Sequence, residues 1–185
     1  MSLLQWNLRY RAGEHLSDIP SPLVERFTAD LVAGDALDLA SGPGRNALYL
    51  AQRGWRVTAV DGSPIAIGIL RARARDKQLT LESQIADLER EQFVVQPDSY
   101  DLICDCYYLQ RDLIPSLQAG VRPGGVLIVI AHLAGPEEPE GTPTRVRPGE
   151  LRGYFADWTV LHDYEGQPTE SCHQHAVAEL VVRKG

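Results

Sequence analysis

The stretch Asp38-Leu39-Ala40-Ser41-Gly42-Pro43-Gly44-Arg45-Asn46-Ala47 decides how this chain folds. It joins an apolar segment predicted as a strand, Ala36 to Ala40, to a segment with helical periodicity that begins at Arg45. Gly42 and Gly44 allow a tight turn and the close approach of a ligand. The start of the helix offers unpaired backbone N–H groups. The stretch therefore predicts a nucleoside-binding loop.

A second signal is Asp61, which lies at the end of another apolar segment and 19 residues beyond Gly42 (61 − 42). A carboxylate at this strand end can accept both hydroxyls of a ribose. Dinucleotide enzymes and S-adenosylmethionine enzymes share this arrangement, and the spacing Gly42-x-Gly44-x-x-Ala47 also fits the loose dinucleotide pattern. The glycine pattern alone leaves both cofactor classes open.

Three features favour a sulfonium cofactor over a pyrophosphate. Asp38 would repel a pyrophosphate, yet it suits the ammonium and sulfonium groups of S-adenosylmethionine. Pro43 removes one N–H from a phosphate-binding turn. Asp87 follows the third predicted strand, where it or the Leu88 backbone can reach an adenine amino group. Arg45 argues the other way, since it can neutralise a phosphate.

Strand and helix signals alternate along the chain, which predicts a parallel α/β sheet. The last two predicted strands are joined by a polar connection with Gly and Pro, so we expect them to pair antiparallel. Strands are predicted at residues 36–40, 55–60, 80–86, 100–106, 126–133, 158–163 and 176–183, and helices at residues 22–32, 45–53, 64–78, 113–119 and 148–155.

The length of 185 residues fits a single domain, residues 1–185. Residues 1–20 are expected to form an N-terminal flap. Residues 134–148 hold four of the 12 Pro and predict a loop long enough to act as a lid.

The formal net charge of −7, from 18 Lys and Arg against 25 Asp and Glu, is typical of proteins that do not bind nucleic acid. No apolar run approaches the ~20 residues of a membrane span. Polar residues between Trp6 and Arg11 interrupt any signal-peptide core. We therefore expect a cytoplasmic protein without a nucleic-acid or membrane partner. The sequence does not indicate an oligomeric state.

Taken together, these residues resemble the class I S-adenosylmethionine-dependent methyltransferases. The resemblance implies a Rossmann-like, doubly wound sheet of seven strands, mostly parallel with the last strand antiparallel, and helices on both faces. Within the class the chain is most similar to the small tellurite-resistance and thiopurine-type enzymes. The shared motifs are Asp38–Asn46, Asp61-Gly62-Ser63, Asp87-Leu88, Tyr100–Ile103, Arg122–Leu127, Trp6-x-x-Arg9-Tyr10 and Gly149-Glu150-Leu151-Arg152-x-Tyr154-Phe155.

This resemblance implies that Asp61 binds ribose and that Trp6 and Tyr10 seal the cofactor. One departure is Ala40, because the family usually has Gly at this position. Its added methyl group can narrow the pocket or shift the loop. The residues predicted to bind S-adenosylmethionine are Trp6, Tyr10, Asp38, Ala40, Ser41, Gly42, Gly44, Asn46, Asp61, Gly62, Ser63, Asp87, Leu88 and Cys104.

Methyl transfer from a sulfonium is an in-line displacement in which the protein mainly positions the partners and excludes water. A general base is not obligatory when the acceptor is a soft anion or a thiol, so the catalytic residue stays open. The candidates are Tyr107 and His132, after the fourth and fifth strands, and His173, because family members often carry a His on the last connection. Each has an alternative role in packing or on an exposed loop.

Cys172-His173-Gln174-His175 combines residue types that bind soft metals. Three neighbours on one turn cannot surround a zinc ion, so no metal site is predicted. The sequence thus predicts a methyltransferase acting on a small molecule. The alternatives are an NAD(P)-dependent oxidoreductase and a catalytically silent S-adenosylmethionine-binding protein. Oxyanion, thiol, amine and carboxylate acceptors all stay open.

Overall fold

The computed structural model describes residues 2–168 and 175–185. The chain divides into two compact units, Met1–Val94 (unit 1) and Val95–Gly185 (unit 2), which are described one after the other.

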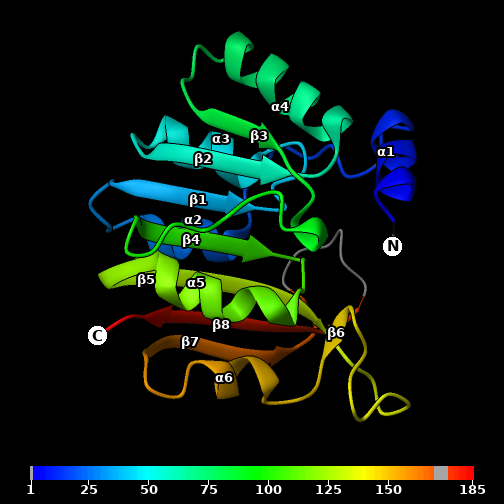
Figure 1. Cartoon of the computed structure of the whole chain (residues 1–185), viewed down its shortest axis with the longest axis vertical. Coiled ribbons are helices and arrows are strands. Elements are labelled where there is room, and N and C mark those ends of the chain that lie inside the picture. Colours follow the sequence, from blue (N-terminus) through cyan, green and yellow to red (C-terminus); the bar gives the residue numbers. More distant parts are fainter. Residues whose placement is uncertain (1, 169–174) are drawn as a thin grey trace. The chain divides into compact units, whose positions relative to one another are not determined.

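Unit 1 contains a parallel sheet in the order β3-β2-β1. Helix α3 packs against β1 and β2, α4 packs against β2 and β3, and α1 contacts α4. Along the chain, unit 1 consists of α1 (Leu3–Arg11), α2 (Pro22–Thr28), β1 (Asp35–Leu39), α3 (Arg45–Gln52), β2 (Arg56–Asp61), α4 (Pro64–Asp76), β3 (Glu82–Ile85) and the 3₁₀ turn η1 (Leu88–Arg90) (Figure 1).

Unit 2 contains strands in the order β4-β5-β8-β7, with the short β6 paired to β5. Strand β5 is parallel to β4 and β6, whereas β8 is antiparallel to both β5 and β7. Along the chain, unit 2 consists of β4 (Tyr100–Cys106), the 3₁₀ turn η2 (Arg111–Leu113), α5 (Ile114–Gly120), β5 (Val121–Leu133), β6 (Arg145–Val146), α6 (Glu150–Tyr154), β7 (Thr159–Gly166) and β8 (Val177–Arg183).

Local sequence explains the start of α4 and the central position of β5. Ser63 caps α4, because its hydroxyl accepts the N–H of Ala66 at 3.1 Å and Pro64 follows with a preset φ. Strand β5 carries the run from Val126 to Ala131, all of it buried, as is typical of a central strand. This apolar run forms part of the core of unit 2.

The predicted fold class is confirmed: the chain is an α/β protein with mostly parallel strands, and its last strand is antiparallel. The prediction lacked two elements. Residues 3–11 form the helix α1, and the predicted loop 134–148 contains β6, so the described residues hold eight strands instead of seven. Helix α2 ends at Thr28, four residues earlier than predicted (32 − 28). The expectation of one domain stays a prediction.

In the part of the chain that the structure describes, no helix has both the length and the apolar character needed to cross a membrane.

Candidate functional site

The loop between β1 and α3, called here the cofactor loop (residues 40–44), has a backbone that glycine favours. Gly42 has φ +54° and Gly44 has φ +81°. A Cβ on Gly44 would lie 2.2 Å from Leu70 Cδ1, so any other residue here would force the buried Leu70 side chain of α4 to move. A Cβ on Gly42 would lie 3.1 Å from the Tyr10 hydroxyl. The first glycine thus makes room for α1 and the second for α4.

Ala40 adopts φ +47°, a left-handed conformation in which an L side chain costs about 1–2 kcal/mol. The departure seen in the sequence is therefore a strained position of the cofactor loop. The neighbouring Ser41 holds the loop in place, because its N–H donates to Val60 O of β2 at 3.0 Å. The Ser41 hydroxyl oxygen is buried and has no hydrogen-bond partner among the described residues.

Asp38 lies near the end of β1 and is only 1% exposed. Its carboxylate accepts the N–H of Ala47 in the first turn of α3 at 3.0 Å. Burial raises the pKa of Asp38 to about 7, although the Ala47 N–H and the Arg45 charge lower it and the Asp61 charge raises it further. A cation bound here would offset the free energy needed to ionise this buried carboxyl group.

The Asp61 side chain links two loops through hydrogen bonds from their backbone N–H groups. One carboxylate oxygen accepts the N–H of Gly42 at 2.8 Å, and the other accepts the N–H of Ser63 at 2.7 Å. Burial raises the pKa of Asp61, while these two hydrogen bonds lower it. Each carboxylate oxygen keeps a lone pair that can accept a ligand hydroxyl.

Helix α1 lies against these loops and contributes two residues that the sequence did not single out. The Asn7 side-chain oxygen accepts the Ser63 hydroxyl at 2.5 Å, and a Cβ on Gly62 would lie 2.6 Å from Leu3 Cδ2. Trp6 and Tyr10, which the sequence did predict, stack at 5.7 Å between ring centroids. Within the predicted flap, residues 1–20, the helix at residues 3–11 thus packs on the cofactor loop and on residues 61–63.

Asn46 and Asp87, also predicted to bind the cofactor, have hydrogen-bond partners within unit 1. Asn46 is buried, and its side-chain oxygen accepts the N–H of Ser21 at 2.9 Å, which fastens the segment before α2 to α3. The Asp87 carboxylate accepts the N–H of Glu89 at 3.1 Å and caps η1, where Leu88 is buried.

This arrangement fits the cofactor that the sequence predicts. Two buried carboxyl groups, Asp38 and Asp61, can meet an ammonium group and a diol, whereas a pyrophosphate would face both of them. The buried Ser41 hydroxyl supplies a further polar contact for a ligand. The chemistry of these donors and acceptors therefore suits S-adenosylmethionine better than a dinucleotide.

In unit 2, Tyr107 and His132 lie close together at the carboxyl ends of β4 and β5. Their ring centroids are 5.7 Å apart, and the His175 ring is 6.0 Å from that of His132. Tyr107 has φ +64°, a strained value for an aromatic residue, and its N–H donates to Ile130 O at 2.6 Å. Burial lowers the pKa of His132, and electrostatic interactions with His175 and Arg145 lower it further. A neutral His132 can accept a proton near pH 7.

Cys104 is fully buried within β4. The third catalytic candidate, His173, lies outside the described residues, as does Cys172. No group of three His, Cys, Asp or Glu side chains that could hold a metal is present in residues 2–168 and 175–185.

The fold and the cofactor loop define a Rossmann-like α/β protein of the kind that binds a nucleoside cofactor. The family model described as "Tellurite resistance protein TehB" matches residues 14–175. The chain belongs to the TehB family, which confirms the resemblance to methyltransferases of the tellurite-resistance type.

Three curated relatives are similar over part of their length. "Hemagglutinin 1" of Eikenella corrodens is 33% identical over 134 residues, which are 68% of this chain and 44% of that protein. "Probable S-adenosyl-L-methionine-dependent methyltransferase TehB" of Haemophilus influenzae strain 10810 is 28% identical over 68% of this chain and 46% of that protein. "2-heptyl-1-hydroxyquinolin-4(1H)-one methyltransferase" of Mycobacteroides abscessus is 29% identical over 70% of this chain and 60% of that protein.

The chain spans about half the length of the first two relatives. The crystal structure of TehB from Haemophilus influenzae superposes with a TM-score of 0.78, at 21% identity, over 97% of this chain and 67% of that one. This likeness supports the Rossmann-like fold.

Proposed function

We propose that the chain catalyses methyl transfer from S-adenosylmethionine to a small-molecule acceptor by a positioned in-line displacement. The observation that carries the proposal is the pair of buried carboxyl groups, Asp38 and Asp61, on either side of the cofactor loop. Membership of the TehB family supports the same reaction. A dinucleotide-dependent reaction is not favoured, because its pyrophosphate would face both acids.

Each residue of unit 1 has a defined part in this proposal. When bound, S-adenosylmethionine supplies an electrophilic methyl group on sulfur. Asp38 holds the positive charge of the methionine portion, and Asp61 accepts the ribose hydroxyls while it fastens Gly42 in place. Asp87 and Leu88 frame the adenine. Trp6 and Tyr10 cover the bound cofactor and exclude water from it.

For the acceptor we propose the group at the strand ends of unit 2, formed by Tyr107, His132 and His175. His132 has a lowered pKa and so is neutral near pH 7, which suits it to take a proton from a neutral acceptor. The acceptor is a small molecule in this proposal. Support comes from the net charge of −7 and from the Mycobacteroides abscessus relative, which is named for a hydroxyquinolone. A cytoplasmic location stays a prediction.

The test is a turnover assay with S-adenosylmethionine and acceptors of four classes: selenite and tellurite, an aryl thiol, a heteroaryl hydroxyl and a carboxylate. Mass spectrometry would follow S-adenosylhomocysteine and the methylated product. We expect both in equal amounts with at least one class, and at least tenfold less of both with Asp61→Asn at a limiting S-adenosylmethionine concentration. Cofactor binding without product in any class would favour the catalytically silent alternative.

A further inference from the structure

Unit 2 contains a charged network around the buried Glu150 that the proposed reaction does not explain. It consists of Arg111, Glu150 and Tyr154 and is called here the Arg111 network. Arg111 Nε lies 2.7 Å from Glu150 Oε1, and Arg111 Nη2 lies 3.2 Å from Glu150 Oε2. The Tyr154 hydroxyl donates to Glu150 Oε1 at 2.7 Å. This two-point contact between guanidinium and carboxylate fixes the orientation of both groups.

Glu150 has donors on both of its oxygens. Its side chain is 5% exposed, and the Arg147 backbone N–H donates to Oε2 at 2.8 Å. Burial raises the pKa of Glu150, but the hydrogen bonds from Arg111, Arg147 and Tyr154 lower it by more. The resulting pKa is about 2. Glu150 therefore stays ionised and the network stays intact at neutral pH.

The other edge of the Arg111 guanidinium holds the turn before β6. Arg111 Nη1 donates to Thr142 O at 2.8 Å, and Nη2 donates to Arg145 O at 3.0 Å. Gly141 has φ +74°, and a Cβ there would lie 2.9 Å from Arg145 O and 3.3 Å from Arg111 Nη2. The turn is thus built around the guanidinium, and Gly141 leaves the space for it.

This turn leads directly into β6, which begins at Arg145. In the β5–β6 pair, Arg145 is in register with His132 and Val146 with Leu133. The Ala134 N–H closes the pair by donating to Val146 O at 2.8 Å. Arg145 also pairs with Glu138 at 3.0 Å, within the same loop. The position of Arg145 therefore depends on the turn that Arg111 holds.

We propose that Arg111, held by Glu150 and Tyr154, is a positioning residue that keeps Arg145 beside His132. The Gly149–Phe155 motif of the sequence then has a structural purpose, since it supplies Glu150 and Tyr154. The loop 134–148, predicted as a lid, is fastened at residues 142–145 by this network. The relevance of His132 to an acceptor rests on the proposed function, whereas the contact that Arg111 maintains does not.

The test is an NMR titration of the His132 imidazole in the full chain, without cofactor or acceptor. The His132 resonance is assigned by its loss in His132→Gln. Within residues 2–168 and 175–185, groups that face His132 include Tyr107 at the end of β4, Arg145 on β6 and His175 before β8. Arg145→Gln removes a positive charge, so we expect it to raise the pKa of His132. When Arg145→Gln is added to the Arg111→Gln variant, the pKa of His132 should not rise further, because Arg145 no longer lies beside His132 in that variant.

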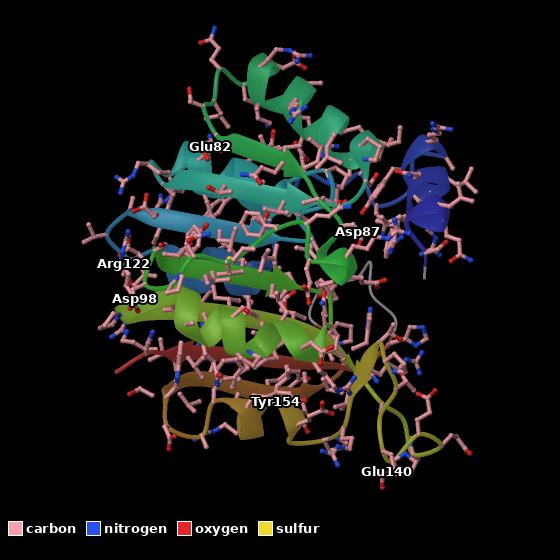
Figure 2. The ribbon with its side chains drawn as sticks, in the orientation of Figure 1. Glu82, Asp87, Asp98, Arg122, Glu140 and Tyr154 are labelled. Atoms are coloured by element: carbon pink, nitrogen blue, oxygen red, sulfur yellow. The ribbon has the colours of Figure 1, made fainter. Side chains whose placement is uncertain are left out.

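Arg122 provides the matched control, since it pairs with Asp101 at 2.6 Å and donates to Asp98 O at 3.2 Å. Figure 2 shows Arg122 and Asp98 at the end of unit 2 away from Glu140, which lies on the loop that carries β6. When Arg145→Gln is added to the Arg122→Gln variant, it should raise the His132 pKa as much as it does in the wild type. Tyr154→Phe, which removes a single hydrogen bond from Glu150, should weaken the Arg145 effect without abolishing it.

Two results would overturn the proposal. The first is that Arg145→Gln raises the pKa of His132 as much in the Arg111→Gln variant as in the wild type. The second is that Arg145→Gln does not change the pKa of His132 in the wild type. If Arg111→Gln does not fold, as judged by circular dichroism, Glu150→Gln takes its place, because it keeps Arg111 but removes the charge that orients it. A failure of methyl transfer would not change the outcome, since the titration needs no turnover.

Discussion

The Asp61 carboxylate accepts the backbone N–H of Gly42 at 2.8 Å, so the end of β2 fixes the glycine of the cofactor loop. The same carboxylate accepts the N–H of Ser63 at 2.7 Å. One buried acid therefore organises both loops that line the proposed cofactor site before any ligand binds. This preorganisation lowers the entropic cost of binding.

Asp61→Asn should destabilise unit 1, because one of the two backbone N–H groups would face an amide NH₂ instead of an oxygen. We expect a loss of about 1–3 kcal/mol in the free energy of unfolding, measured by urea denaturation. Asp35→Asn is the control. It breaks the Asp35–Arg56 pair at the amino ends of β1 and β2, in which the Arg56 side chain is 73% exposed, and should cost at most about 1 kcal/mol. Equal losses for both variants would contradict this assignment.

Ala40→Gly should stabilise the chain by about 1 kcal/mol, because glycine adopts φ +47° without the steric cost that alanine bears. Urea denaturation gives the free energy directly. The control is Ala72→Gly in the middle of α4, which should destabilise the chain by about 1 kcal/mol. A loss of stability in Ala40→Gly would mean that the strain has another compensation. Tighter cofactor binding in this variant would show that the native loop is compromised.

The stability of the chain should depend on pH through Asp38, whose pKa burial raises from 3.8 to about 7. The native state holds this proton more tightly than the unfolded state does. The stability that the proton contributes is therefore complete below about pH 4 and is lost as the pH rises through about 7. Asp38→Asn cannot ionise, so wild type should lose stability relative to this variant between pH 4 and 7. Parallel curves for the two proteins in urea denaturation would contradict this.

Much of unit 1 was predictable because its signals are local. Arg45–Gln52 begins directly after a glycine with positive φ, and the apolar runs of β1 and β2 end in Asp38 and Asp61 nearby. Helix α1 was missed, although its capping box of Ser2 and Gln5 is a local sequence signal. Its mixture of apolar and charged residues hid the helix, because Leu4 and Leu8 are exposed and the apolar positions form no regular buried face.

Contacts between distant residues could not be predicted from the sequence. Arg111 and Glu150 are separated by 39 positions, and neither has a neighbour along the chain that indicates the pairing. The two-residue strand β6 lies in a segment rich in Pro, where strand signals are weak. Arg145 pairs with Glu138, and Arg147 pairs with Glu140 and Glu150, contacts that no local sequence pattern indicates.

The central claim is that the cofactor loop binds S-adenosylmethionine, and isothermal titration calorimetry with S-adenosylhomocysteine and, separately, with NADH tests it most directly. We predict binding of S-adenosylhomocysteine, no heat with NADH, and at least tenfold weaker binding in Asp61→Asn, which corresponds to about 1.4 kcal/mol. Asp35→Asn should bind as tightly as the wild type. Binding of NADH without binding of S-adenosylhomocysteine would contradict the claim.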